Sequence, residues 1–235
     1  MIHVEGLEGR VAVVTGAGRG IGLKVAEVLA ANGARVAALD LTPPDDTAIL
    51  GIECDVSDEA AVKAAFDEVE AKLGTASVLV LDAGIFPSMA LEETSTELWE
   101  RTISINLTGS FFCVRRAIPA MRKLGYGRIV ALGAAAGKSG GARSAAYAAS
   151  KAGLMTLMKS VAIEYARDGI TANVVAPALI DTELLAGGRD LVSHIPVGRL
   201  GTTDEVAALV AFLASGHAGY ITGESVDING GTLID

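Results

Sequence analysis

The sequence predicts an α/β fold in which helices cover both faces of a doubly wound parallel sheet of about seven strands. Short, nearly continuous apolar runs alternate with longer helical patterns from one end of the 235-residue chain to the other. Such runs are typical of parallel strands buried on both faces, and their alternation with helices builds right-handed βαβ units. No linker, repeat or low-complexity segment interrupts the pattern, so we expect one domain over residues 1–235.

Each element is assigned from its apolar pattern and from the residues that bound it. Short β-branched runs predict strands over Arg10–Thr15, Arg35–Asp40, Gly51–Cys54, Ser77–Leu81, Arg128–Leu132, Thr171–Val175 and Ser225–Ile228. Helical periodicity predicts helices over Ile21–Ala31, Asp58–Leu73, Ser95–Lys123, Ala145–Arg167 and Thr203–Ala214. The expected N-caps are Ser57, Thr94 and Thr202, and the glycines expected to close helices are Gly33, Gly74 and Gly169.

Composition and charge limit the class of protein. The chain is 51% hydrophobic and 20% charged, which excludes a disordered protein. A formal net charge of −9 argues against nucleic acid or an anionic membrane as partner. Residues 1–10 do not resemble a signal peptide, and the longest apolar run, Val206–Ala214, is too short to span a bilayer. Cys54 and Cys113 lack metal-ligand spacing, so we expect reduced thiols, no metal and a cytoplasmic protein.

A glycine-rich turn follows the first predicted strand and precedes the first helix. It reads Thr15-Gly16-Ala17-Gly18-Arg19-Gly20-Ile21-Gly22. Glycine lets the backbone turn sharply and approach a pyrophosphate, while the helix N-terminus supplies amide donors and positive potential. A tight turn alone would also explain the cluster, but its place between strand and helix favours a dinucleotide site. The candidate cofactor-binding residues here are Gly16, Arg19, Gly20, Ile21 and Gly22.

Asp40 ends the second predicted strand, 18 residues beyond Gly22. A carboxylate there accepts hydrogen bonds from the adenosine ribose hydroxyls and repels a 2′-phosphate. The alternative is a surface turn residue, a position that suits aspartate. Arg19 argues in the other direction, because a base beside the glycine turn could hold a 2′-phosphate. The pattern favours NAD as cofactor over NADP.

Tyr147 and Lys151 are four residues apart in a predicted helix, which places both side chains on one face. A free tyrosine has a pKa near 10 and is a poor proton donor or acceptor at neutral pH. We expect the lysine ammonium to favour the phenolate and lower the pKa of Tyr147 toward the working range. The pair therefore predicts an acid/base centre.

Taken together, these motifs resemble the short-chain dehydrogenases/reductases over essentially the full chain, which implies a Rossmann-like fold. The shared features are Thr15-Gly-x-x-x-Gly-x-Gly22, Cys54-Asp55-Val56, Ala83-Gly84, Asn106, Tyr147-x-x-x-Lys151 and the segment from Pro177 to Thr182. The chain is most similar to the 3-oxoacyl reductase-like branch, given Ile195-Pro-Val-Gly-Arg-Leu-Gly201 and Ile228-Asn-Gly-Gly231.

The resemblance implies a role for each matching position. Around the cofactor, Asp55 and Val56 would meet the adenine, Ala83 and Gly84 would flank the nicotinamide ribose, and Pro177, Ile180 and Thr182 would hold the carboxamide end. Lys151 would also hold the nicotinamide ribose. Asn106 would anchor a water that links Lys151 to solvent for proton relay. The implied catalytic residues are thus Tyr147, Lys151 and Asn106.

The chain departs from the family at the catalytic serine, which the family carries 13 residues before the tyrosine. Here that position is Ala134, which cannot donate a hydrogen bond to the substrate oxygen. Loss of one such donor costs on the order of 10²–10³ in rate. Three explanations compete: deliberate replacement to trap a complex, a substitute donor from Ser139 or Ser144, or drift to poor catalysis with cofactor binding retained. The candidate substrate-contacting residues are Ala134, Ser139 and Tyr147.

Two further departures concern Asp82 and Ala178. Asp82 stands where the family usually carries asparagine, and a carboxylate cannot reproduce both hydrogen bonds of an amide unless it is protonated. Ala178 follows Pro177 where glycine is usual, and stiffens the loop that leads toward the substrate.

The sequence therefore predicts an NAD(H)-dependent oxidoreductase that interconverts a secondary alcohol and a ketone, free or as a 3-oxoacyl thioester. The rival prediction is a cofactor-binding homologue with little turnover and a structural or regulatory role. Only 13 residues separate Thr182 from Pro196, which predicts a short lid and an open pocket, with His194 within it. Asp168 and the acidic chain argue against an acyl carrier protein as partner. The resemblance implies a homotetramer, or a homodimer.

Overall fold

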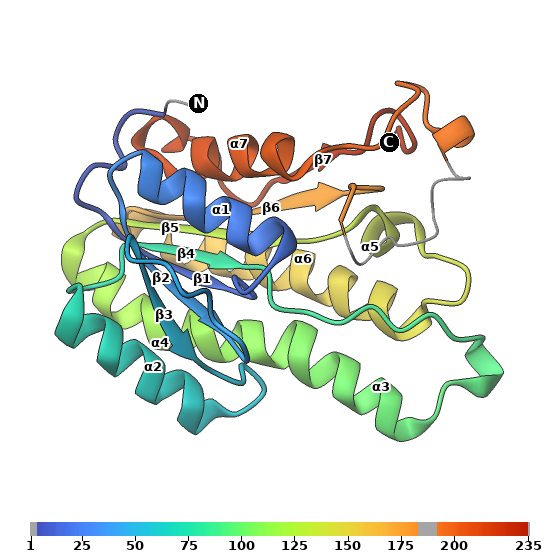
Figure 1. Ribbon diagram of the computed structural model, residues 1–235, viewed down its shortest axis with the longest axis horizontal. Helices are drawn as coiled ribbons and strands as arrows, with labels where there is room; N and C mark the ends of the chain where they lie inside the picture. The colour runs from blue at the N-terminus through green and yellow to red at the C-terminus, as the bar shows by residue number, and fades with distance from the viewer. Residues whose placement is uncertain (1–3, 183–191, 235) are drawn as a thin grey trace.

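Seven parallel strands form one sheet in the order β3-β2-β1-β4-β5-β6-β7, with helices on both faces (Figure 1). The computed structural model describes residues 4–182 and 192–234. The strands are β1 (Val11–Thr15), β2 (Arg35–Asp40), β3 (Ile49–Glu53), β4 (Val78–Leu81), β5 (Gly127–Leu132), β6 (Ile170–Pro177) and β7 (Ser225–Ile228). The helices are α1 (Gly20–Ala31), α2 (Glu59–Lys72), α3 (Thr96–Ile103), α4 (Gly109–Leu124), α5 (Ala135–Ser139), α6 (Ala145–Tyr165) and α7 (Thr203–Ala214). The predicted doubly wound fold is confirmed.

Two apolar layers sandwich the sheet, which explains why its strands read as continuous apolar runs. Helices α1 and α7 pack on one face, and α2, α4 and α6 pack on the other (Figure 1). Along β1, Ala12 and Val14 belong to the first layer, whereas Val11 and Val13 belong to the second. Every position of the strand is therefore buried, as parallel sheets covered on both sides require.

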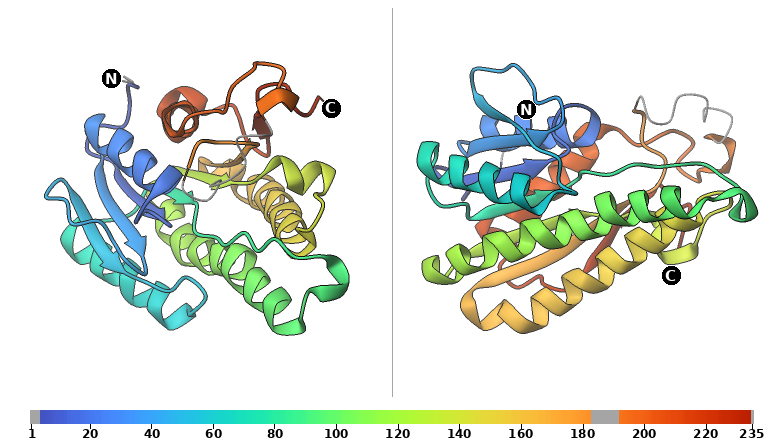
Figure 2. Two further views of the ribbon diagram at one scale, coloured as in Figure 1. Left: turned by 45° about the vertical axis from the view of Figure 1, so that its right-hand side comes forward. Right: turned by 90° about the horizontal axis from the view of Figure 1, so that it is seen from below.

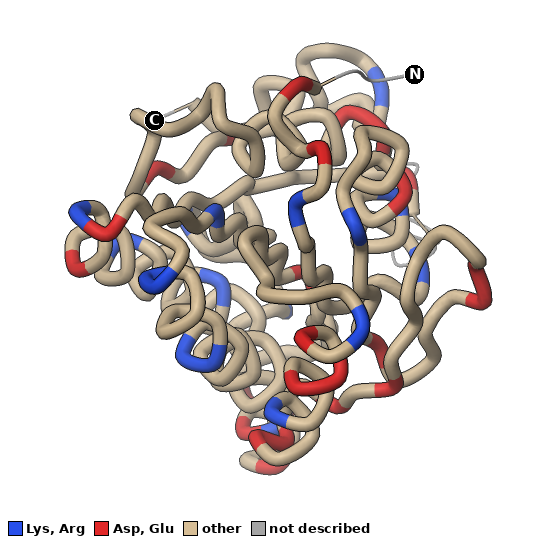
Figure 3. The backbone as a smooth tube through the Cα atoms, turned by 90° about the vertical axis from the view of Figure 1, so that its left-hand side faces the viewer, with Lys and Arg blue, Asp and Glu red and all other residues tan. Residues whose placement is uncertain are grey.

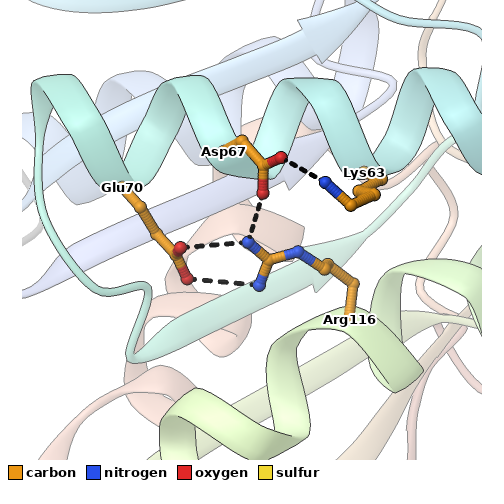
Figure 4. A network of polar contacts seen from close by, with 4 residues as sticks. All are labelled: Lys63, Asp67, Glu70 and Arg116. Atoms are coloured by element: carbon orange, nitrogen blue, oxygen red, sulfur yellow. Dashed lines mark hydrogen bonds and ion pairs between the residues drawn. The ribbon is translucent and has the colours of Figure 1, made fainter.

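A polar network joins α2 to α4 at the surface (Figure 4). The Arg116 guanidinium donates to both carboxylate oxygens of Glu70, at 3.2 and 3.0 Å, and to Asp67 at 2.7 Å. Lys63 donates to the same Asp67 at 2.6 Å. Hydrogen bonds from Lys63 and Arg116 lower the pKa of Asp67. Exposed pairs of this kind contribute little individually to stability. Figure 3 shows that both acidic and basic positions occur on the side of the molecule that it presents.

One predicted helix, Ser95–Lys123, is divided in the structure. Helices α3 and α4 are joined by a π turn over Ser104–Thr108, whose flanking residues keep right-handed helical angles. A π turn inserts an extra residue into a helix and shifts the side chains away from regular helical spacing. Such turns recur at functional sites. Here the turn contains Asn106, whose side chain is completely buried. Apolar periodicity could not reveal it, since the helical angles continue.

Smaller differences concern helix ends. The helices expected to be capped by Ser57 and Thr94 are capped one residue later, by Asp58 and Ser95, whose side chains accept from backbone amides. Thr202 caps α7 as predicted and forms a capping box with its third helical residue. Helix α5 was not predicted, because a helix of five residues is too short to show an apolar periodicity. Among the described residues, none of the helices has the length and apolar character needed to cross a bilayer.

Candidate active site

The candidate residues gather at the carboxyl ends of the strands, where the winding of the sheet reverses. From β1 the chain continues to β2 on one side, whereas the neighbouring β4 leads to β5 on the other. Open α/β sheets bind ligands in the crevice at such a point. The glycine turn follows β1, Asp40 ends β2, and Asp82 follows β4. These residues therefore lie at the same edge of the sheet.

The glycine turn leaves no room for side chains at three of its positions. A Cβ would lie 2.6 Å from the Ala83 nitrogen at Gly16, 2.4 Å from the Thr42 oxygen at Gly18 and 2.3 Å from the Gly16 oxygen at Gly22. Around Gly20, the first residue of α1, nothing lies within 4 Å of that position. The turn is thus closed toward the protein and open at the helix N-terminus. These features fit the phosphates of a dinucleotide.

Asp40 is fixed beside this turn by two backbone amides. Its Oδ2 accepts from the Gly18 amide at 3.0 Å, and its Oδ1 accepts from the Thr42 amide at 3.0 Å. A carboxylate oxygen has lone pairs for more than one donor, so Asp40 can still accept from ribose hydroxyls. Arg19 is the exposed N-cap residue of α1.

Asn106 connects three separate segments of the site. Its Oδ1 accepts from the Ile85 amide at 2.8 Å, and its Nδ2 donates to the Ile85 carbonyl at 3.0 Å. The same Nδ2 donates to the Ser150 hydroxyl at 3.0 Å, and that hydroxyl donates to the Tyr147 carbonyl at 2.7 Å. The π turn, the segment after β4 and helix α6 are therefore held in one arrangement.

Tyr147 and Lys151 lie one turn apart on α6. The Lys151 Nζ is 5.7 Å from the centroid of the Tyr147 ring and donates to the Leu132 carbonyl, at the end of β5, at 2.6 Å. The Phe86 ring packs against the Tyr147 ring at a centroid distance of 4.8 Å and an interplanar angle of 82°. Edge-to-face contacts of this kind orient both rings. The phenol is thus placed by one helix and one loop.

The pKa of Tyr147 is shifted opposite to the expected direction. Burial, with a further contribution from the Asp82 carboxylate, raises it to about 12. Burial lowers the pKa of Lys151, and Asp82 opposes that shift. The prediction that the pKa of Tyr147 is lowered is therefore wrong for this structure, because burial and the Asp82 charge both disfavour the phenolate.

Asp82 lies between the glycine turn and helix α6, which carries Tyr147 and Lys151. Its amide and that of Ala83 donate to the Thr15 hydroxyl, each at 3.2 Å. Burial raises the pKa of Asp82 to about 6, while Lys151 and a hydrogen bond from the Gly22 amide act in the opposite direction. The Asp82 carboxylate thus accepts a hydrogen bond from the Gly22 amide, and its pKa lies well above the ordinary value for aspartate.

In the described loop after β5, no serine hydroxyl is hydrogen-bonded to Asn106, Tyr147 or Lys151. Ala134 is buried and caps α5. The Ser139 hydroxyl, on an exposed residue, can donate to the carbonyl of Ala135 or of Gly140, each at 3.2 Å. The Ser144 hydroxyl donates to the carbonyl of Gly141 at 3.0 Å. Both candidate substitute donors therefore have partners within their own loop.

The remaining predicted residues lie around the same edge of the sheet. Asp55, exposed after β3, accepts from the amide and hydroxyl of Ser57 at 2.9 and 2.7 Å, and Val56 beside it is buried. Pro177 ends β6, and Ile180 pairs with Gly201 in an isolated parallel bridge. Most of the predicted short lid, residues 183–191, lies outside the described residues, and Thr182 directly precedes them.

Sequence reasoning missed two residues that contact Tyr147. Ser150 is three positions beyond it and one before Lys151, a spacing that allows a hydroxyl to bond back within its helix. That spacing was a usable signal. Phe86 left none, because the sequence does not show that the segment after β4 runs along the start of α6.

Known proteins resemble this chain over nearly its whole length. A family model described as enoyl-(acyl carrier protein) reductase matches residues 16–232. The chain is 40% identical over 237 residues to 3-oxoacyl-[acyl-carrier-protein] reductase FabG of Escherichia coli, covering 95% of this chain and 97% of the relative. It is also 40% identical over 227 residues to 3-oxoacyl-[acyl-carrier-protein] reductase MabA of Mycobacterium tuberculosis, covering 94% and 92%.

Fold, site and relatives together define an oxidoreductase that uses a nicotinamide cofactor and acts on CH-OH groups. Asn106 and the Tyr147–Lys151 pair are linked through Ser150 and lie on the same side of the sheet edge as Gly84. The chain belongs to the short-chain dehydrogenase/reductase family.

The raised pKa of Asp82 predicts a pH-dependent stability difference. A carboxyl group whose folded pKa, about 6, exceeds its ordinary value of 3.8 destabilises the fold as pH rises between those values. Asp82→Asn should therefore be more stable than the natural chain at pH 7, by roughly 1–3 kcal/mol. The gain should largely disappear near pH 4, where the carboxyl group is protonated in the folded state and about half ionised in the unfolded state.

Urea unfolding at pH 4 and pH 7 measures this difference, with Asp46→Asn, on an exposed loop, as the matched control. An Asp82→Asn gain of equal size at both pH values would show that ionisation of Asp82 is not its cause.

Proposed function

We propose that this protein is an NAD(H)-dependent oxidoreductase that interconverts a secondary alcohol and a ketone, free or as a 3-oxoacyl thioester. The observation that carries the proposal is the Tyr147–Lys151 pair on α6, placed beside a glycine turn that fits a dinucleotide. The relatives, which are named as 3-oxoacyl reductases, support a carbonyl group as the reacting centre.

In this proposal the bound nicotinamide supplies or accepts the hydride. Tyr147 donates its phenol proton to the substrate oxygen in reduction and receives a proton from the alcohol in oxidation. Lys151 holds the nicotinamide ribose with its ammonium group. The backbone carbonyl of Asn106 accepts from the Ser110 hydroxyl at 3.0 Å, which keeps the π turn in place. Asn106 would there anchor a water that relays protons to Lys151.

The remaining residues bind and orient the cofactor. The phosphates would be bound by the turn formed by Gly16, Arg19, Gly20, Ile21 and Gly22. Asp40 would accept from the adenosine ribose, and Asp55 and Val56 would bind the adenine. The nicotinamide end would be held by Ala83, Gly84, Pro177, Ile180 and Thr182.

A second candidate function follows from Ala134. This position offers a methyl group where a hydroxyl donor would face the substrate oxygen, and the hydroxyls of Ser139 and Ser144 have partners elsewhere. These facts favour a homologue that binds the cofactor with little turnover and acts structurally or as a regulator. The intact set of Asn106, Tyr147 and Lys151 favours the enzyme.

We favour a small ketone or thioester over a carrier-protein substrate. An acidic carrier protein would need basic partners, and Arg122, near the end of α4, is already paired with Asp168 at 3.0 Å. The net charge of −9 would also repel such a partner. The same charge is the reason that nucleic acid and membrane are not proposed as partners.

We also propose a homotetramer, or a homodimer, in the cytoplasm. Helices α4 and α6 lie side by side on the outside of the molecule (Figure 2). They expose apolar side chains at Phe111, Leu124 and Ile163, the last of which is 85% exposed. Exposed apolar faces of this kind mark protein interfaces. The buried free thiols of Cys54 and Cys113 suit a reducing compartment.

The cofactor preference can be tested by titrating NADH and NADPH against the protein and following fluorescence. NADH should bind at least about tenfold more tightly, because Asp40 would repel a 2′-phosphate and about 1.4 kcal/mol suffices for that ratio. Asp40→Asn should reduce the difference in affinity between NADH and NADPH. Arg19→Ala should leave that difference in affinity unchanged. Equal or tighter NADPH binding to the natural chain would contradict the preference.

Tyr147→Phe should lower turnover by at least roughly 100-fold, the usual contribution of a positioned proton donor. Its affinity for NADH should change little, since the phenol hydroxyl contributes little to cofactor burial. Lys151→Ala should reduce both quantities. Full activity in Tyr147→Phe would exclude Tyr147 as the acid/base.

Ala134→Ser tests which of the two candidate functions is correct. The new hydroxyl should raise kcat by roughly one to three orders of magnitude, because charge on the substrate oxygen develops in the transition state. The gain should appear in kcat more than in KM. A protein that stays nearly inactive would favour the non-catalytic homologue, and a highly active natural chain with no gain would show that another donor serves.

A further inference from the structure

Lys138 on α5 and Asp227 on β7 form a largely buried ion pair. The Lys138 Nζ is 2.6 Å from the Asp227 Oδ2, and the two side chains are only 19% and 21% exposed. The same Nζ donates to the Ser225 carbonyl at 3.4 Å. By comparison, the equally short pair of Lys72 and Glu68 on α2 is 55% and 41% exposed. The Lys138–Asp227 pair is therefore much less screened by solvent.

The helix that carries Lys138 rests directly on the catalytic helix. A Cβ at Gly137 would lie 3.0 Å from the Ala152 nitrogen and 3.1 Å from the Lys151 Cβ. Glycine thus allows the backbone of α5 to touch α6 at the turn that bears Lys151. Any shift of α5 would change this contact, because there is no flexible side chain between the two backbones.

The strand that carries Asp227 also borders the site. In the parallel register of β6 and β7, Asp227 is opposite Ala176. One residue further, the Ala178 amide donates to the Ile228 carbonyl at 3.3 Å, at the start of the segment that leads to Ile180. Helix α5 is therefore held from two sides, by the catalytic helix through Gly137 and by the last strand through Lys138.

The pair is not optimised for stability alone. Among the described residues, the Asp227 Oδ1 and the Ser225 hydroxyl are buried without a hydrogen-bond partner. A buried polar atom without a partner costs free energy, and a buried ion pair is often no more stabilising than apolar side chains of the same size. A buried ion pair is better explained by a role in specifying a single arrangement of the two elements that it joins.

We propose that Lys138 and Asp227 are positioning residues for the reaction. Resting on the function proposed above, the pair fixes α5 against the helix that carries Tyr147 and Lys151, and thereby holds the Tyr147 phenol in place relative to the substrate oxygen. Neither side chain touches the reacting atoms. Breaking the pair lets α5 move, and a displacement of about 1 Å at the reacting centre costs up to about 100-fold in rate.

The test compares Asp227→Asn, Lys138→Met and the double variant with the natural chain and with Lys72→Met, which removes the exposed pair on α2. NADH is the cofactor, and acetoacetyl-coenzyme A and 2-butanone are the substrates. Each single variant should lose roughly 10–100-fold in kcat, with NADH affinity within twofold of the natural chain. The double variant should lose no more than either single variant, because the residues act as one pair. Lys72→Met should leave kcat unchanged.

Lys138→Arg keeps the charge and should recover most of kcat, which also provides a folded variant if the neutral ones do not fold. An unchanged kcat in a folded Asp227→Asn, or a failure of Lys138→Arg to recover kcat, would overturn the positioning role while leaving the proposed function intact. Absence of turnover in the natural chain and in Ala134→Ser alike would overturn the proposed function, and this proposal with it.

Discussion

The close approach of the segments that follow β1 and β4 is the constraint on which the site depends. Gly16 fits there because a Cβ would lie 2.6 Å from the Ala83 nitrogen, and Gly22 fits because one would lie 2.8 Å from the Asp82 carboxylate. The Thr15 hydroxyl binds both amides of the opposing segment. As a result, the glycine turn that suits phosphates lies against the segment that carries Phe86, whose ring contacts Tyr147.

Polar contacts connect the segment after β4 to helix α6 and fix the position of that helix. Asn106 binds Ile85 through both ends of its amide and reaches Ser150 on α6. An amide is suited to this task because it has a donor and an acceptor, and complete burial makes each of its bonds costly to break. The π turn is what places this side chain between the segment after β4 and α6. Tyr147 is thus located by the sheet through two intermediates, not by its own helix alone.

The sequence predicted the fold, the glycine turn and the Tyr147–Lys151 spacing because each depends on local pattern. It could not reveal the π turn, whose angles remain helical, or the contact between Phe86 and Tyr147, which joins residues 61 positions apart. The error on the pKa of Tyr147 has a physical origin. Spacing along a helix shows that a lysine is near, but the balance between its charge and the burial of the phenol depends on what surrounds both.

That balance bears on the direction of the chemistry. With a pKa raised to about 12, Tyr147 keeps its proton at neutral pH. A protonated phenol is in the form needed to donate to a carbonyl oxygen, whereas oxidation of an alcohol needs the phenolate. Asp82 strengthens this bias once it ionises, since its charge opposes a second negative charge nearby. In the proposed mechanism, the two departures from the family would act on the same oxygen of the substrate: Ala134 would offer no donor, and the Asp82 charge would favour the protonated form of Tyr147.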